Sequence, residues 1–91
     1  MIRRVIRISN ALGLHARAAA RLVKTSSRFE SRVSLTTLDN QKTADGKSIL
    51  AVMLLAASCG TELELAVEGP DEERATEEII RLIEGSFDEE E

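Results

Sequence analysis

Two side chains near the N-terminus are suited by type and spacing to phosphate chemistry. The segment Gly13-Leu14-His15-Ala16-Arg17 holds the only histidine of the chain, directly before a predicted helix. Unpaired backbone N–H groups and the positive end of the helix dipole favour an anion at such a position. Arg17 adds a guanidinium group, which matches a phosphate well. A nucleophilic imidazole beside phosphate ligands is suited to becoming a phosphohistidine, although these residues alone leave an ordinary loop histidine as an alternative.

The strands that must position these residues are indicated by the spacing of apolar side chains. Leu63, Leu65 and Val67 alternate with the residues between them, as in a half-buried strand. The dipeptide Asp39-Asn40 favours a hairpin turn. The four expected strands lie around residues 6–8, 33–35, 42–44 and 62–67.

Helices are expected between these strands and after the last one. The first covers residues 16–27. Its apolar side is predicted to contain Ala16, Ala19, Ala20 and Val23, with Leu22 at the edge. The second follows Ser48, a good N-cap, through the apolar residues 49–57 to a stop at Gly60.

The order of elements, β-α-β-β-α-β-α, indicates an α+β fold. The last helix is predicted to start at Asp71 and to end at Gly85. Alternating strands predict a sheet with one solvated face, and amphipathic helices would cover the other, which gives an open-faced β-sandwich. A ferredoxin-like split βαβ with an extra helix is also compatible with the pattern. The 91 residues have room for one domain, expected to span 1–87 and to be followed by an acidic tail at 88–91.

Composition excludes several classes of protein. A single cysteine, Cys59, rules out a disulfide scaffold, and one Cys with one His is too few for a closed zinc site, so no metal is expected. No apolar run approaches the ~20 residues of a membrane span, and the N-terminus lacks the apolar segment of a signal peptide. We therefore expect a cytoplasmic protein without membrane insertion. The net charge of -4 and the absence of Tyr and Trp argue against nucleic-acid binding.

Two surfaces are candidates for contact with a partner protein. A basic stripe on the first helix consists of Arg17, Arg21, Lys24 and Arg28, within about 60° of arc. A solvated face is the default interpretation of such a stripe, and a docking edge for an acidic partner is the alternative. The second helix is apolar all round, so either all its side chains belong to the core or some form an exposed interface patch.

The sequence resembles the HPr family, the histidine-containing phosphocarriers of the phosphoenolpyruvate-dependent phosphotransferase system. The resemblance rests on the segment around His15, on Gly46-Lys47-Ser48-Ile49 and on the order and length of the elements. It implies a four-stranded antiparallel sheet covered on one face by three helices. One residue departs from the family pattern, since Ala18 stands where proline usually follows the His-Ala-Arg triplet. The change removes no reactive group, so we expect the chemistry to survive.

The resemblance also implies roles for the candidate residues. His15 would accept a phosphoryl group on Nδ1 from phosphorylated enzyme I and pass it to a histidine of an enzyme IIA domain. The Arg17 side chain and the backbone amides of Ala16 and Arg17 would hold the phosphate. Ser48, although an N-cap by its position, matches the regulatory serine that an HPr kinase/phosphorylase modifies in some bacteria.

Partner contacts are expected on both candidate surfaces. The resemblance favours Ile49, Leu50 and Met53, beside Ala20, as docking positions. From the basic stripe, Arg21 and Lys24 are expected to face the partner, and Lys47 is expected to pair with a phosphate on Ser48.

The function indicated is that of a stoichiometric phosphocarrier rather than an enzyme, acting as a monomer without a cofactor. The alternative is a regulatory HPr-like module that works through Ser48 phosphorylation and protein contacts instead of sugar transport. The presence of His15 with Arg17 argues against the purely regulatory form, which does not need a nucleophile.

Overall fold

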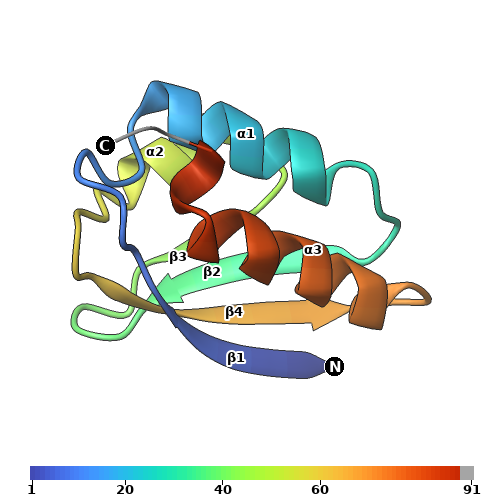
Figure 1. Cartoon of the computed structure of the whole chain (residues 1–91). Helices are drawn as coiled ribbons and strands as arrows, with labels where there is room; N and C mark the ends of the chain where they lie inside the picture. Colours follow the sequence, from blue (N-terminus) through green and yellow to red (C-terminus); the bar gives the residue numbers. More distant parts are fainter. Residues whose placement is uncertain (89–91) are drawn as a thin grey trace.

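The sheet and the helices form two layers, with all three α-helices on one face of the sheet (Figure 1). The computed structural model describes residues 1–88. The strands are β1 (Ile2–Arg7), β2 (Arg32–Thr37), β3 (Thr43–Asp45) and β4 (Glu62–Glu68). The helices are α1 (Ala16–Ser26), α2 (Ile49–Leu54) and α3 (Glu72–Glu84), followed by the short 3-10 helix η1 (Ser86–Asp88). From residue 89 on, the predicted acidic tail lies outside the described residues.

All strand pairings in the sheet are antiparallel, and the strands lie in the order β1-β4-β2-β3. β4 is paired on one side with β1, where Glu64 faces Val5, and on the other with β2, where Leu65 faces Leu35. A ferredoxin-like sheet is also antiparallel, but its central strands are β1 and β3, whereas β4 and β2 are central here. The ferredoxin-like alternative is therefore wrong, and the open-faced sandwich is confirmed.

The core lies between the sheet and the helices. The side chains of β2 and β4 that face the helices are buried, namely Val33, Leu35, Leu63, Leu65 and Val67. Each such side chain stabilises the fold by roughly 1.5–3 kcal/mol relative to exposure, so the alternation seen in the sequence selects the face that the helices cover. Within residues 1–88, no helix is both long enough and apolar enough to cross a bilayer.

The buried face of α1 agrees only in part with the one predicted, since Ala19, Leu22 and Val23 face the core. Its buried side chains are Ala18, Ala19, Leu22 and Ser26. Ala16 and Ala20, which were expected on the core side, are exposed. Alanine occurs on every side of this helix, so apolar spacing does not distinguish its faces, and the burial of Leu22 decides the orientation. The result places Arg17 and Ala20 on the solvent side.

α2 is shorter than predicted, since it ends at Leu54 instead of near residue 57. Ala56 adopts a left-handed conformation with φ +54°, which a helix cannot continue through. Gly60 is not the helix stop. It has φ +93°, and its N–H donates to the Ile8 carbonyl at 2.7 Å, so it belongs to the loop that enters β4. An uninterrupted apolar run offers no polar residue that would mark where the helix ends.

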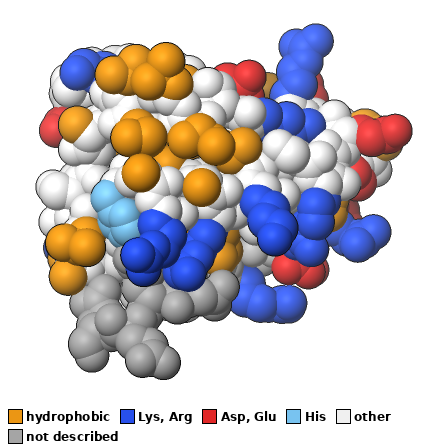
Figure 2. All heavy atoms as spheres, turned by 90° about the horizontal axis from the view of Figure 1, so that it is seen from above, with side chains coloured by type: hydrophobic (Ala, Val, Ile, Leu, Met, Phe, Trp, Pro, Cys, Tyr) orange, Lys and Arg blue, Asp and Glu red, His pale blue; other side chains and the backbone are white. Residues whose placement is uncertain are grey.

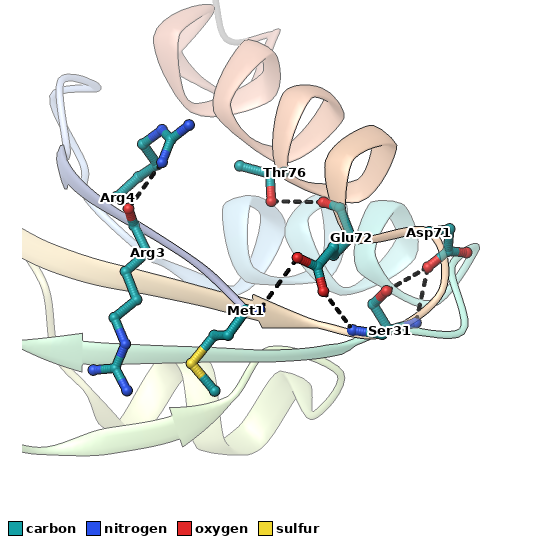
Figure 3. Close-up of polar contacts among 8 residues, drawn as sticks. Met1, Arg3, Arg4, Ser31, Asp71, Glu72 and Thr76 are labelled. Carbon is teal, nitrogen blue, oxygen red and sulfur yellow. Dashed lines mark hydrogen bonds and ion pairs between the residues drawn. The ribbon is translucent and has the colours of Figure 1, made fainter.

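Carboxylates fix the beginning of α3 (Figure 3). Asp71 accepts hydrogen bonds from the N–H and the hydroxyl of Ser31, at 3.0 and 2.5 Å. Glu72 accepts from the Gly69 N–H at 3.1 Å and lies 3.3 Å from the ammonium group of Met1. The Ser31 hydroxyl is the main cause that holds the pKa of Asp71 below its usual value, and the Gly69 N–H is the main cause for the lowered pKa of Glu72. The predicted start of the helix at Asp71 is confirmed to within one residue.

Candidate functional site

The loop that leads into α1 is held against the connection between α2 and β4. Leu14 is buried, and its N–H donates to the Ala57 carbonyl at 2.8 Å. Gly13 has φ +65°, and a Cβ at this position would lie 2.4 Å from the Ala57 oxygen and 2.7 Å from the Ser58 Cα. Glycine alone meets both requirements without strain. The glycine-leucine pair therefore fixes where α1 begins.

His15 is the N-cap residue of α1. Its backbone is extended, and its carbonyl accepts from the Ala19 N–H at 2.8 Å. Its Nδ1 accepts a hydrogen bond from the Arg17 N–H at 3.3 Å, the role that a serine or aspartate oxygen usually has at a helix start. A ring nitrogen that accepts carries no proton, so the neutral ring holds its proton on Nε2. Nδ1 thus directs its lone pair to the first turn of α1.

The first turn of α1 is suited to an anion. The helix has 11 residues and no acidic side chain in this turn, and its dipole is positive here. Ala16 and Arg17 are exposed, and His15 is half-buried. Figure 2 shows the histidine at the surface with basic side chains on one side of it. The predicted phosphate-binding groups are therefore all located at one accessible end of α1.

The four basic residues of the predicted stripe fall into two groups, and one of them, Arg28, lies beyond the end of α1. Arg17 and Lys24 are exposed, and their side chains form no ion pair with the side chains of residues 1–87. Arg21 is half-buried, and its guanidinium donates to the Phe87 carbonyl, which ties α1 to η1. Arg28 lies 3.8 Å from a glutamate of α3. The predicted stripe thus contains two available cations near its start and middle, while the others already have intramolecular contacts.

An apolar patch lies on α2, on the side away from the sheet. The exposed side chains that form this α2 patch are Ile49, Leu50, Met53 and Leu54. Leu50 and Leu54 are the most exposed of them, at 68% and 67%. Figure 2 shows hydrophobic side chains gathered above the histidine, while basic ones lie to its lower right. The interpretation that all of α2 is core is therefore wrong, and the three predicted docking positions on α2 are exposed.

Ser48 is the N-cap of α2, as expected. Its Oγ accepts from the Ala51 N–H at 3.2 Å, and its N–H donates to the Asp45 carbonyl at 3.1 Å. Lys47 is half-buried, and its Nζ donates to the Phe29 carbonyl at 2.6 Å. The Lys47 ammonium group thus holds the loop after α1.

Two residues of this region escape the sequence patterns. Leu54 extends the α2 patch by one helical turn from Leu50, and its i, i+4 spacing from that predicted docking position is the sequence signal that could have found it. Asn10 is buried in the loop before α1, and its Nδ2 donates to the Gly13 carbonyl at 2.7 Å. Nothing in the sequence distinguishes a buried turn asparagine from an exposed one.

Comparison with known proteins gives a consistent answer. Residues 2–85 match the family model described as "PTS HPr component phosphorylation site". The chain is 46% identical over 90 residues to the phosphocarrier protein HPr of Treponema pallidum (strain Nichols), covering 99% of this chain and 100% of that one. It matches the crystal structure of HPr-C-His from Thermoanaerobacter tengcongensis with a TM-score of 0.92 at 41% identity, covering all of both chains. A crystal structure of an HPr dimer from the same organism matches with a TM-score of 0.76 at 40% identity, covering 98% of this chain and 100% of that one. The chain belongs to the HPr family, the phosphocarrier proteins of the bacterial phosphotransferase system.

Proposed function

We propose that this protein carries phosphoryl groups on Nδ1 of His15, from phosphorylated enzyme I to a histidine of an enzyme IIA domain of the sugar phosphotransferase system. The observation that carries the proposal is the hydrogen bond from the Arg17 N–H to Nδ1 at 3.3 Å. It leaves that nitrogen unprotonated at the positive end of α1. Membership of the HPr family supports the choice of partners. The protein acts as a stoichiometric carrier with a phosphohistidine intermediate.

In the accepting step, the Nδ1 lone pair attacks the phosphorus atom of the donor. A P–N bond forms on His15 while the bond between phosphorus and the donor breaks, and its electron pair leaves with the donor. The ring already holds its proton on Nε2, so the step needs no general base. The Arg17 N–H then donates to a phosphoryl oxygen instead of Nδ1, and the Arg17 guanidinium balances the negative charge. Transfer to enzyme IIA reverses these changes.

We propose that both partners dock on the surface around His15. It comprises Arg17, Ala20, Arg21 and Lys24 of α1, Lys47, and Ile49, Leu50, Met53 and Leu54 of α2. An apolar centre with a basic rim suits an interface that forms and separates readily, and the rim speeds encounter with an acidic partner. Because one surface serves donor and acceptor in turn, we propose that the protein works as a monomer in the cytoplasm.

Phosphorylation of Ser48 by an HPr kinase/phosphorylase is the regulation that we propose. Ser48 directly precedes Ile49 and Leu50 of the α2 patch. A phosphate there adds about -1.5 to -2 charges, which hydrate the apolar centre and repel acidic groups of enzyme I. We expect Ser48→Asp to slow phosphoryl transfer from enzyme I several-fold, and equal rates for Ser48→Asp and the wild type would refute this regulation.

Incubation with phosphoenolpyruvate, enzyme I and magnesium tests the carrier function. We expect the chain to acquire an acid-labile, base-stable phosphate that is absent in His15→Ala. Cys59→Ala is the control, since it removes the other strong nucleophile and is expected to retain the phosphate. Failure of the wild type to take up phosphate from an enzyme I that phosphorylates its own carrier would contradict the proposal and favour the regulatory module.

A further inference from the structure

We propose that Asn10 is a positioning residue whose carboxamide sets the orientation of His15. The inference rests on the proposed function, because it concerns the geometry of the phosphoryl acceptor. Asn10 lies in the loop between β1 and α1 and is completely buried, with 0% exposure. A buried carboxamide costs free energy unless it is hydrogen-bonded. Its position therefore depends on specific contacts of the kind that define a local backbone geometry.

The carboxamide acts on the peptide unit that joins Gly13 to Leu14. Nδ2 of Asn10 donates to the Gly13 carbonyl at 2.7 Å, at one end of this peptide unit. The Leu14 N–H, at the other end, donates to the Ala57 carbonyl at 2.8 Å. The Gly13 N–H also donates to the Asn10 carbonyl at 3.2 Å, so the turn is closed by both the backbone and the side chain of Asn10. The peptide plane before the histidine is thus held from two opposite directions.

This clamp matters because Gly13 has little conformational preference of its own. Glycine at φ +65° rotates readily unless its neighbours are fixed. Beyond the clamped peptide, Leu14 is buried and the His15 carbonyl is bonded to the Ala19 N–H. The Cα of His15 is therefore fixed from both sides. The hydrogen bond from the Arg17 N–H to Nδ1, at 3.3 Å, can form only while that Cα stays in place.

The test compares Asn10→Ala with Asn40→Ala. Asn40 is the control, because its side chain also makes a hydrogen bond within a turn. It accepts from the Thr37 hydroxyl in the turn between β2 and β3, away from His15. The first measurement needs no phosphate. The ¹⁵N chemical shifts of the His15 ring and the Arg17 amide report the tautomer and the Nδ1 hydrogen bond. We expect an unprotonated Nδ1 in the wild type and in Asn40→Ala, and a mixture of tautomers with a shifted Arg17 amide in Asn10→Ala.

The second measurement is the rate of phosphoryl transfer from phosphorylated enzyme I, at a temperature where every variant is folded. We expect Asn10→Ala to be about 10- to 100-fold slower than the wild type, as for a displaced reacting group, and Asn40→Ala to match the wild type. Asn10→Ser keeps a shorter donor and is expected to recover part of the rate and of the wild-type tautomer. A folded Asn10→Ala with wild-type ring shifts and wild-type rate would reduce Asn10 to a stability element and overturn the proposal.

Two further outcomes are separable. If Asn10→Ala does not fold, Asn10→Ser tests the proposal through the ¹⁵N shifts of its His15 ring and its transfer rate. Wild-type values for both would overturn the proposal. If the wild type takes up no phosphate from an active enzyme I, the proposed function fails, while the ring tautomers of the Asn10 variants still show whether Asn10 orients His15.

Discussion

The chain enters α1 and α3 through similar glycine-containing loops, but different side chains accept hydrogen bonds at the two helix N-termini. Each follows a glycine with positive φ that packs closely on another backbone segment, Gly13 on the α2–β4 connection and Gly69 on Ser31. At α3 the carboxylates of Asp71 and Glu72 accept hydrogen bonds from backbone N–H groups, and Glu72 also faces the N-terminal ammonium group (Figure 3). At α1 the cap is an imidazole nitrogen, and the first turn has no acidic side chain.

The difference distinguishes a structural contact, between the start of α3 and Ser31, from a candidate functional site at the start of α1. A helix N-terminus attracts negative charge in either case. At α3 the chain supplies that charge itself, and it links the loop before β2 to the last helix. At α1 the first turn itself holds an accepting ring nitrogen and a cationic side chain but no acidic one, so it suits a negative group that it does not supply. If His15 is the covalent acceptor that we propose, it would hold and release such a group.

The largest expected effect comes from adding a methyl group at the two glycines. Gly13→Ala and Gly69→Ala should each destabilise the fold by about 2–4 kcal/mol, because the new Cβ meets backbone atoms closer than 3 Å and φ is positive. Gly60→Ala is the control, since φ is also positive but the nearest atom is 4.0 Å away, and about 1 kcal/mol is expected. Urea unfolding measures all three.

The same variants sharpen the comparison when phosphoryl transfer is measured on the folded fraction. We expect a loss for Gly13→Ala and none for Gly69→Ala. Equal losses of transfer rate would show that the two N-termini are coupled. The distinction between a structural contact at α3 and a functional site at α1 would then fail.

A smaller effect is expected when α1 is given the acid that α3 has. Ala16 is exposed, so Ala16→Glu places a carboxylate in the first turn without disturbing the core. Repulsion of the incoming phosphoryl group should slow transfer about tenfold at low salt, while the helix gains about 0.3–1 kcal/mol. Ala16→Gln has the same length without the charge and should keep the wild-type rate. Stopped-flow transfer rates for the two variants distinguish charge repulsion from a steric effect. Similar slowing of both would point to a steric cause.

The smallest effect concerns pH and the Asp71 carboxylate. Because hydrogen bonds lower the pKa of Asp71 from its ordinary 3.8, this group adds stability that is complete above that pH and is lost as pH falls through it toward the folded-state value. The stability difference between the wild type and Asp71→Asn should therefore shrink on acidification below pH 3.8. Urea unfolding at several pH values measures it. A difference in stability that is constant with pH would mean that the charge of Asp71 contributes nothing to the contact between Ser31 and the start of α3.

The sequence predicts well those elements that have one buried and one solvated face, or a cap within their own first turn. Leu63 and Leu65 reveal β4 because a sheet with one wet face imposes alternation on its residues. Ser48 reveals the start of α2 because its hydroxyl bonds within its own helical turn. The buried face of α1 is not predictable from its alanines, and the end of α2 is not predictable from an unbroken apolar run.

The candidate site divides in the same way. The stretch from Gly13 to Arg17 is contiguous, so its residue types predict a phosphate site, although they also leave an ordinary loop histidine as the alternative. The contacts of Arg21 with Phe87 and of Lys47 with Phe29 are different. In each, a long cation binds a backbone carbonyl that is distant in sequence, and every residue has such a carbonyl. Such contacts leave no trace in the composition or spacing.

The position of β1 at the edge of the sheet has a consequence for synthesis of the chain. β1 is made first but pairs with β4, as Ile2 does with Val67, and Leu14 is anchored on Ala57. A nascent chain on the ribosome therefore contains His15, the proposed phosphoryl acceptor, long before it contains Ala57 and β4, which hold the loop before α1 in place. Contacts so distant in sequence also form late in folding. We expect the nascent protein to be inert toward phosphoryl donors until β4 has emerged, and then to become competent in one cooperative step.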